Sequence, residues 1–382
     1  MKVLALSQSF APGFRGGSFQ ALTHMVERLG RDCEFWVIAR DRDPFQPDPL
    51  PGIVVDRWTT HGLARVFYSA RTRHPILLSR LMAQAAPDVV FMNSLFATGS
   101  IGLLILRRAG GVRVPMIVAP EGELTPGALA GSPGRKRWYL RIARALRLFA
   151  GVTWLARDAG EQADIARAFP EASPAFVVPC LGPSRPREVV PALDKVQGAV
   201  TLLFLSRITP KKNLTFLLEV LRDDPGGDLD LEIVGPIEDD RYWARCQALI
   251  AQLPVSVRVR YRGECAPAEV PGWLARSHAF VLPTLGENYG YVVAEALEAG
   301  RPVLVSNQTP WDGLQADRAG WTLPLSADSW RAAIAQLRQM PAHEYQGWCL
   351  GARARGVASR PPESTAHATL DVLRHAASTG GR

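Results

Sequence analysis

The 382-residue chain has few cysteines and no long apolar run. Its five cysteines are odd in number, scattered, and never spaced as Cys-x-x-Cys. This excludes a cysteine-based zinc site and favours a reducing compartment. No segment reaches the ~18 uninterrupted apolar residues of a membrane span. The opening residues, MKVLALSQSF, break their apolar run at Ser7 and are expected to form a first strand rather than a signal peptide.

Common signatures for nucleotides and nucleic acids are also missing. The P-loop pattern GxxxxGK[ST] occurs nowhere, and the loop 8–17 (QSFAPGFRGG) is not GxGxxG. Gly16 and Gly17 in that loop allow a close backbone approach to a ligand, or simply a tight turn. The positive residues are spread along the chain, and no nucleic-acid-binding motif accompanies them. We therefore expect no nucleic-acid partner.

The composition is that of a globular protein with a positive charge. Hydrophobic residues make up 47% and charged residues 21%, and the length favours two domains. The net charge is +8 and the isoelectric point is about 9.5. This excess reflects either an arginine-rich composition alone or an anionic partner, such as nucleotide phosphates or acidic lipid.

Short apolar segments alternate with helical patterns through the first half. This pattern predicts a parallel sheet covered on both faces. The expected strands are 3–7, 33–39, 53–58, 88–92, 114–119, 152–156 and 176–178, with helices near 18–29, 76–85 and 99–109. The Pro-rich run 179–198 is the expected linker.

The alternation starts again after the linker. Strands are expected at 200–206, 231–234, 257–261, 279–282, 303–305 and 320–323, and helices near 214–222, 240–252, 269–275, 289–298, 326–338, 342–354 and 364–376. The predicted organisation is a first domain (1–180), a linker (181–198), a second domain (199–355) and a helical tail (356–382). We expect two Rossmann-like, doubly wound α/β domains that face each other across a cleft.

The stretch 278–312 carries the chemistry of the second domain. Glu287 lies in the loop before an expected helix, and Glu295 lies inside it, so both are expected at the carboxyl end of a strand. Arg207 ends the first strand of this domain, and Lys212 follows before a helix. Two cations beside a helix amino terminus suit a diphosphate.

Two features of the first domain suggest other partners. Glu121 and Glu123 follow the fifth expected strand at the usual ligand edge of such a sheet. Residues 135–147 form a basic amphipathic helix, which is either a solvated face or a contact with an anionic membrane surface.

Several of these segments together resemble retaining glycosyltransferases of the GT-B fold, family 4. SRITPKKN (206–213) resembles their GRL-x-P-x-KG signature, with Asn213 in place of the usual glycine. LGENYGYVVAEALEAGRPVLVSNQTPW (285–311) resembles their E-x7-E signature, and SFAPGFRGG (9–17) their Gly-rich loop. The likeness is greatest over 200–323 and is closest to the branch that builds bacterial exopolysaccharide and lipopolysaccharide.

The resemblance implies transfer of a sugar from a nucleotide sugar to a glycan or lipid-linked acceptor, with retention of anomeric configuration. It implies that Arg207 and Lys212 neutralise the leaving diphosphate, that Glu287 contacts the donor sugar and that Glu295 contacts the ribose. The donor-site candidates are Gly16, Gly17, Arg207, Lys212, Gly286, Glu287, Asn288, Tyr289, Gly290 and Glu295. Glu121 and Glu123 are the acceptor-side candidates.

No cofactor is expected, and no metal is required, because the cations already offset the phosphate charge. The Asp-x-Asp patterns at 41–43 and 228–230 are expected to be solvated turns. The implied location is cytoplasmic, at the inner face of the membrane if the basic helix binds lipid. A sugar-nucleotide epimerase and a non-catalytic scaffold of a polysaccharide synthesis complex stay open as alternatives.

Overall fold

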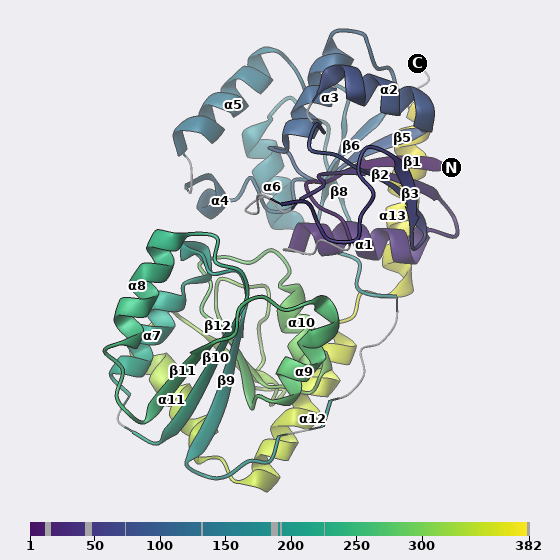
Figure 1. The fold of residues 1–382 in the computed structure, drawn as a ribbon. Helices are drawn as coiled ribbons and strands as arrows, with labels where there is room; N and C mark the ends of the chain where they lie inside the picture. Colours follow the sequence, from purple (N-terminus) through teal and green to yellow (C-terminus); the bar gives the residue numbers. More distant parts are fainter. Residues whose placement is uncertain are drawn as a thin grey trace. The chain divides into compact units, whose positions relative to one another are not determined.

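The computed structural model describes residues 1–11, 17–42, 48–72, 74–130, 133–184, 190–191, 193–224 and 226–379. The chain divides into two compact units, shown in Figure 1. The first unit combines Met1–Ser184 with Pro361–Arg382, and the second is Arg185–Arg360. The last part of the chain therefore belongs to the first unit, whereas the sequence predicts residues 356–382 as a separate tail.

The first unit is built on an eight-stranded sheet of order β3-β4-β2-β1-β5-β6-β7-β8. All neighbouring strands are parallel except β3 and β4. The central strands are short apolar runs that are buried on both faces, as a parallel sheet between helices requires. The strands are β1 Lys2–Leu6, β2 Glu34–Ala39, β3 Trp58–His61, β4 Ala64–Tyr68, β5 Val89–Met92, β6 Met116–Val118, β7 Thr153–Ala156 and β8 Phe176–Val177.

The strand predicted at 53–58 is wrong. The sheet edge is instead the antiparallel hairpin β3–β4, which turns at Gly62 with a positive φ of 57°. Two apolar residues in the middle of the predicted segment lie at the surface, with Val54 50% and Val55 43% exposed. An apolar run alone does not reveal whether a segment is covered.

Helices cover both faces of this sheet. The helix α13 packs its apolar residues Leu370, Leu373 and Ala376 into the same core as β1 and β5. It also approaches α1, where Arg28 pairs with Glu363. The helices of this unit are α1 Gly17–Leu29, α2 Pro75–Ala85, α3 Thr98–Arg108, α4 Pro126–Ala130, α5 Pro133–Ala145, α6 Ala159–Ala168 and α13 Glu363–Thr379.

The second unit has a six-stranded parallel sheet of order β11-β10-β9-β12-β13-β14. In Figure 1, α7, α8 and α11 lie on one face of this sheet and α9, α10 and α12 on the other. The strands are β9 Ala199–Leu205, β10 Asp228–Val234, β11 Val257–Tyr261, β12 Ala279–Leu282, β13 Val303–Ser306 and β14 Gly320–Leu323. The helices are α7 Leu214–Arg222, α8 Asp240–Ile250, α9 Val270–Ala275, α10 Tyr291–Glu298, α11 Ala327–Gln339 and α12 Ala342–Ala358, with short 3-10 turns at Pro210–Lys212 and Pro267–Glu269.

Each sheet reverses its strand order once. The reversal lies between β1 and β5 in the first unit and between β9 and β12 in the second. At such a point the loops leave neighbouring strands in opposite directions and open a crevice, which is where open α/β sheets bind ligands. Two α/β sheets of parallel strands with a helical carboxyl-terminal end agree with the predicted fold class. Over the described residues, every helix is too short or too polar to cross a membrane.

Candidate functional site

The reversal in the second sheet brings together two segments that lie far apart in the sequence. Strands β9 and β12 are paired, so the turn that follows β9 meets the loop that follows β12. The amide of Leu285 donates to the carbonyl of Lys211 at 2.8 Å, and the hydroxyl of Thr284 donates to the same carbonyl at 3.1 Å. These bonds hold the turn 210–212 against the loop 283–290.

Lys212 and Glu287 form an ion pair at this junction. The distance from Lys212 Nζ to Glu287 Oε2 is 2.5 Å, and the two side chains are 11% and 16% exposed. Burial raises the pKa of Glu287. The charges of Lys212, then Lys211 and Arg207, lower it by more than burial raises it, so the pKa lies below its ordinary value. Glu287 is therefore a carboxylate surrounded by cations, which suits it to accept hydrogen bonds from hydroxyl groups.

Arg207 lies beside the pair and keeps part of its guanidinium open. Its Nη1 donates to Glu238 Oε2 at 3.0 Å and to Oε1 at 3.2 Å. Glu238 is 5% exposed, whereas the arginine side chain is 37% exposed. Glu238 and Lys211 are not among the residues predicted from the sequence, and only Lys211 has a local signal there, the adjacent lysines of PKK (210–212).

The glycines of the loop differ in their surroundings. Gly290 caps α10 with φ +78°, and a Cβ there would meet Glu287 Cγ and Trp311 Nε1, each at 3.2 Å. A Cβ on Gly286 would meet only Lys211 Cε, at 3.9 Å. Gly290 therefore serves the backbone turn, while Gly286 borders open space next to the cations. The helix α10 begins at Tyr291, two residues later than the predicted start at Tyr289.

The remaining loop candidates, Asn288 and Tyr289, are half-buried. The indole Nε1 of Trp311 donates to the carbonyl of Tyr289 at 2.7 Å, and the two rings lie 5.9 Å apart. The amide of Glu287 donates to the carbonyl of Gln308 at 3.0 Å. The loop that carries Glu287 is thus held from the segment after β13.

Glu295 lies on α10 and is 5% exposed. The pKa of the Cys265 thiol is raised to about 11 by its burial, then by Glu269, Glu295 and Glu264. Glu295 is therefore near the segment that follows β11, whereas Glu287 faces the turn after β9. The two carboxylates face different neighbours, which fits separate contacts with one extended ligand.

Asn213 departs from the pattern without changing the site. It adopts φ 59° and precedes α7. Asparagine tolerates this left-handed conformation better than other side chains, so it replaces glycine here at small cost.

In the first unit, Glu121 belongs to a buried network at the ends of β6 and β7. Its Oε1 accepts from Arg157 Nε at 2.9 Å, and both side chains are at most 5% exposed. Arg157's amide and Gly122's amide donate to Glu161 at 2.8 and 2.5 Å. Burial, then the charge of Glu121, raises the pKa of Glu161 to about 7. Arg157 went unnoticed in the sequence.

Glu123 has a different surrounding. Its Oε1 accepts from the hydroxyl of Ser94 at 2.7 Å, and its Oε2 accepts from the amides of Leu95 and Phe96 at 2.6 and 3.3 Å. Both oxygens therefore hold the loop that follows β5, which leaves this carboxylate little capacity for a ligand.

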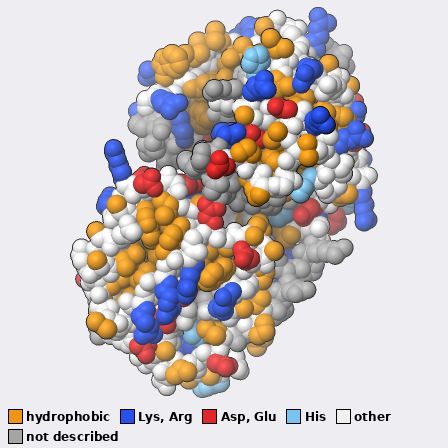
Figure 2. Space-filling model, viewed as in Figure 1, with side chains coloured by type: hydrophobic (Ala, Val, Ile, Leu, Met, Phe, Trp, Pro, Cys, Tyr) orange, Lys and Arg blue, Asp and Glu red, His pale blue; other side chains and the backbone are white. Residues whose placement is uncertain are grey.

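Gly16 lies outside the described residues, and Gly17 begins α1. The Asp-x-Asp at 228–230 is part of β10 rather than a turn, and its carboxylates pair with arginines of β11. Arg258 lies 2.9 Å from Asp230 and 3.3 Å from Asp228. Figure 2 shows basic side chains in a row over β10 and β11. Asp43 of the other pattern is outside the described part.

Residues 187–345 match the family described as Glycosyl transferases group 1. The matched range lies within the second unit. The matched range includes Arg207, Lys212, Glu287 and Glu295. The match therefore covers the donor-site candidates of the second unit and none of those in the first.

Comparison with known proteins extends the likeness to more of the chain. The chain is 27% identical over 201 residues to O-antigen chain mannosyltransferase B of Escherichia coli. The aligned residues cover 50% of this chain and 50% of that protein. It is also 27% identical over 312 residues to D-inositol 3-phosphate glycosyltransferase of Frankia alni. That alignment covers 76% of this chain and 74% of that protein. The chain thus aligns with about half the length of the first relative.

The solved structure of Anabaena Alr3699/HepE in complex with UDP and glucose has the same fold. It matches with a TM-score of 0.69 at 16% sequence identity, over 98% of this chain and 100% of that chain. The predicted GT-B fold class, with two Rossmann-like sheets, is confirmed by this likeness and by the topology of the two units.

Proposed function

We propose that the protein is a glycosyltransferase that moves a sugar from a nucleoside diphosphate sugar to a glycan or lipid-linked acceptor, with retention of anomeric configuration. The observation that carries the proposal is the cluster of Arg207, Lys211 and Lys212 around Glu287. In transfer, the bond from the anomeric carbon to the diphosphate breaks and its electron pair stays with the diphosphate. Cations at that place stabilise the developing charge.

Each side chain of the cluster has a role in this reaction. Lys212 and Arg207 bind the diphosphate, and Gly286 leaves space for it next to Lys211. Once the donor phosphates bind the ammonium group of Lys212, Glu287 is released from its ion pair with that lysine and accepts hydrogen bonds from the hydroxyls of the donor sugar. Glu295, on α10, contacts the ribose. Glu121, held by Arg157, is the acceptor-side candidate of the first unit.

A thermal-shift screen with UDP-, GDP-, ADP- and dTDP-sugars tests donor binding. A donor at 100 times its dissociation constant adds about 2.7 kcal/mol to the stability of the folded protein. Lys212→Ala removes this shift, whereas Arg80→Gln, an exposed arginine of the first unit, leaves it unchanged. A normal shift in the Lys212→Ala variant would contradict the assignment of the site.

The stereochemistry and the acceptor need a second measurement. Proton NMR of the product shows whether the anomeric configuration of the donor is kept. The relative named as O-antigen chain mannosyltransferase B supports a role in cell-surface glycan synthesis. Its name and that of the D-inositol 3-phosphate glycosyltransferase guide the choice of acceptors. Consumption of donor without any acceptor would favour an epimerase, and donor binding without turnover would favour a scaffold.

We further propose that α5 contacts an anionic membrane surface from the cytoplasmic side. Arg137 and Arg141 are one helical turn apart and exposed, Trp138 is 68% exposed, and no acidic side chain of the described residues pairs with these arginines. Figure 2 shows hydrophobic and basic side chains together over this helix. Each arginine near such a surface contributes about 1 kcal/mol.

Vesicle sedimentation tests this contact. Arg137→Gln with Arg141→Gln is expected to weaken binding to vesicles that contain phosphatidylglycerol by about tenfold or more. The matched control replaces two exposed arginines elsewhere, Arg31 and Arg80, by glutamine. Equal losses in both double variants would show that total charge, rather than α5, determines the binding.

A further inference from the structure

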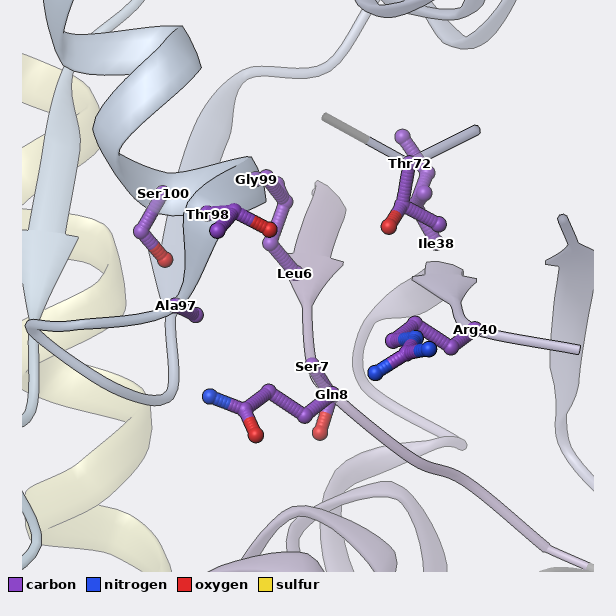
Figure 3. A pocket seen from close by; sticks show the side chains of 10 residues that line it. All are labelled: Leu6, Ser7, Gln8, Ile38, Arg40, Thr72, Ala97, Thr98, Gly99 and Ser100. Atoms are coloured by element: carbon purple, nitrogen blue, oxygen red, sulfur yellow. The ribbon is translucent and has the colours of Figure 1, made fainter. Parts of the chain in front are cut away.

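The two strand-order reversals have different surroundings. In the first unit, the reversal between β1 and β5 leaves a small open pocket whose lining includes Arg40 and Ser100, shown in Figure 3. In the second unit, the loop after β12 is tied by hydrogen bonds to the segment that follows β13. That loop carries Glu287, so the groups that hold it bear on the donor site.

The loop 283–290 is held from the segment after β13 at Glu287 and again just beyond it. The amide of Glu287 donates to the carbonyl of Gln308 at 3.0 Å. Two residues later, the carbonyl of Tyr289 accepts from Trp311 Nε1 at 2.7 Å. The first bond uses backbone atoms alone, whereas the second depends on the side chain of Trp311. The sequence of the chain can therefore alter the loop at this second bond.

Trp311 is itself fixed by the core of the second unit. It is 4% exposed and belongs to the apolar cluster that includes the residues of β12 and β13. Its carbonyl accepts a hydrogen bond from the hydroxyl of Thr322 on β14. An indole has one N–H and no acceptor, so this anchored ring offers a single donor, which it gives to the loop.

The indole also lies next to the side chain of Glu287. A Cβ on Gly290 would be 3.2 Å from Trp311 Nε1 and 3.2 Å from Glu287 Cγ, so both groups border the same small space. Gly290 has a φ of +78° and caps α10. The hydrogen bond to the carbonyl of Tyr289 therefore fixes the orientation of the peptide that joins the loop to the helix.

We propose that Trp311 is a positioning residue, which directs the carboxylate of Glu287 toward the hydroxyls of the donor sugar. The contact between Glu287 and the sugar rests on the proposed function. Arg207 and Lys212 follow β9 and lie on a different segment, so the binding of the diphosphate does not depend on the indole. The sugar and the diphosphate of one donor are therefore expected to respond differently to a change at Trp311.

Calorimetric titration of the full chain with a matched pair of ligands tests this role. The pair is the sugar nucleotide with the largest effect in the thermal-shift screen, such as UDP-glucose or GDP-mannose, and its nucleoside diphosphate. The readout is the ratio of the two dissociation constants. Trp311→Phe keeps an aromatic ring but removes the N–H. It is expected to weaken binding of the sugar nucleotide roughly fivefold to tenfold and to change that of the nucleoside diphosphate by less than about twofold.

Trp330→Phe is the matched control. Trp330 is fully buried in the same unit, and its Nε1 donates to the carbonyl of Pro324 at 3.1 Å. Both substitutions remove a hydrogen bond from an indole to a backbone carbonyl, so similar losses of stability in urea unfolding are expected. Only Trp311→Phe is expected to change the ratio of the dissociation constants. An equal change in Trp330→Phe would show a general loosening of the unit and would overturn the proposal.

A double variant tests whether Trp311 acts through the carboxylate. In the Glu287→Gln background, Trp311→Phe is expected to change the ratio by less than about twofold, because the carboxylate that the indole directs is gone. An undiminished effect in that background overturns the proposal. Thr322→Val is a milder variant, which removes only the hydroxyl that donates to the carbonyl of Trp311. It is expected to shift the ratio in the same direction by about twofold to threefold, and it replaces Trp311→Phe if that variant does not fold.

The outcomes separate this role from the proposed function. If the natural chain binds neither sugar nucleotides nor nucleoside diphosphates, the proposed function is wrong and the role of Trp311 falls with it. If the natural chain transfers sugar and the ratio of dissociation constants is the same in Trp311→Phe, the role of Trp311 alone is wrong. An equal loss of affinity for both ligands in Trp311→Phe also overturns it, because the indole then serves the whole site.

Discussion

The ion pair between Lys212 and Glu287 gives the sharpest test of the donor site. Lys212 Nζ and Glu287 Oε2 are 2.5 Å apart, and the two side chains are 11% and 16% exposed. Each charge has therefore lost most of its hydration, and the opposite charge compensates for that loss. Removing one partner of a fully buried pair costs about 3–5 kcal/mol. Because this pair is partly exposed, we expect about 2–3 kcal/mol for Lys212→Met and for Glu287→Gln.

The double variant separates stability from binding. With both charges removed, neither leaves an uncompensated partner, so the double variant is expected to lose about 1–2 kcal/mol less than the sum of the single losses. Donor binding does not recover in the same way, because the diphosphate needs the ammonium of Lys212. All variants without this lysine are expected to bind nucleoside diphosphate at least about tenfold more weakly.

Urea unfolding gives the stabilities, and calorimetric titration with UDP and GDP gives the affinities. If the single losses simply add in the double variant, the two side chains are not coupled and the geometry of the pair is wrong. If the double variant binds nucleoside diphosphate normally, the assignment of Lys212 to the phosphates is wrong. Replacement of Arg31, an exposed arginine in the first unit, is the control for nonspecific effects of charge.

Three further predictions concern single positions. Gly290→Ala is expected to destabilise the protein by about 1–2 kcal/mol, because the φ of Gly290 is +78° and a Cβ there would press on Glu287 Cγ. Gly286→Ala has room for its Cβ, so it is expected to keep the stability but to weaken donor binding. Equal unfolding midpoints for the two variants would contradict this difference. Glu161 has a folded-state pKa of about 7 against an ordinary 4.5, so the folded protein holds its proton at pH values where the unfolded chain has released it. Stability is therefore expected to fall by roughly 3 kcal/mol as the pH rises from about 4.5 to about 7. Glu161→Gln removes that slope, and an unchanged slope in this variant would show that another group titrates. The lowered pKa of Glu287 acts in the opposite sense: its stabilisation is present above its ordinary pKa and is lost as the pH falls through the folded value, so the Glu287→Gln variant is expected to lack an acid-side decrease in stability that the natural chain shows.

Much of the fold follows from local pattern. The strands β9 to β14 lie within two or three residues of the predicted ranges because buried parallel strands are short apolar runs between helices. The hairpin β3–β4 could not be predicted, because residues 53–55 are as apolar as the buried strands, yet they remain partly exposed. Local apolarity does not say which segment finds a partner strand.

The proposed donor-site residues could be named from the sequence because their motifs are contiguous. Arg207 and Lys212 lie in one segment, Glu287 and Glu295 in another, and each segment keeps its residues in fixed positions relative to a strand end. The partners could not be named in this way. Glu238 reaches Arg207 from the end of β10, and Arg157 reaches Glu121 from the end of β7.

The sequence by itself determined the alternation of strands and helices, the two parallel sheets and the two charged segments of the second unit, because these depend on neighbours in the chain. Tertiary structure alone decided which strands are adjacent. Pairing of β9 with β12 sets the cations against Glu287, and pairing of β1 with β5 leaves the pocket of Arg40 and Ser100. Strand order depends on contacts between distant residues, so the two crevices and the groups that line them emerge only when the sheets form.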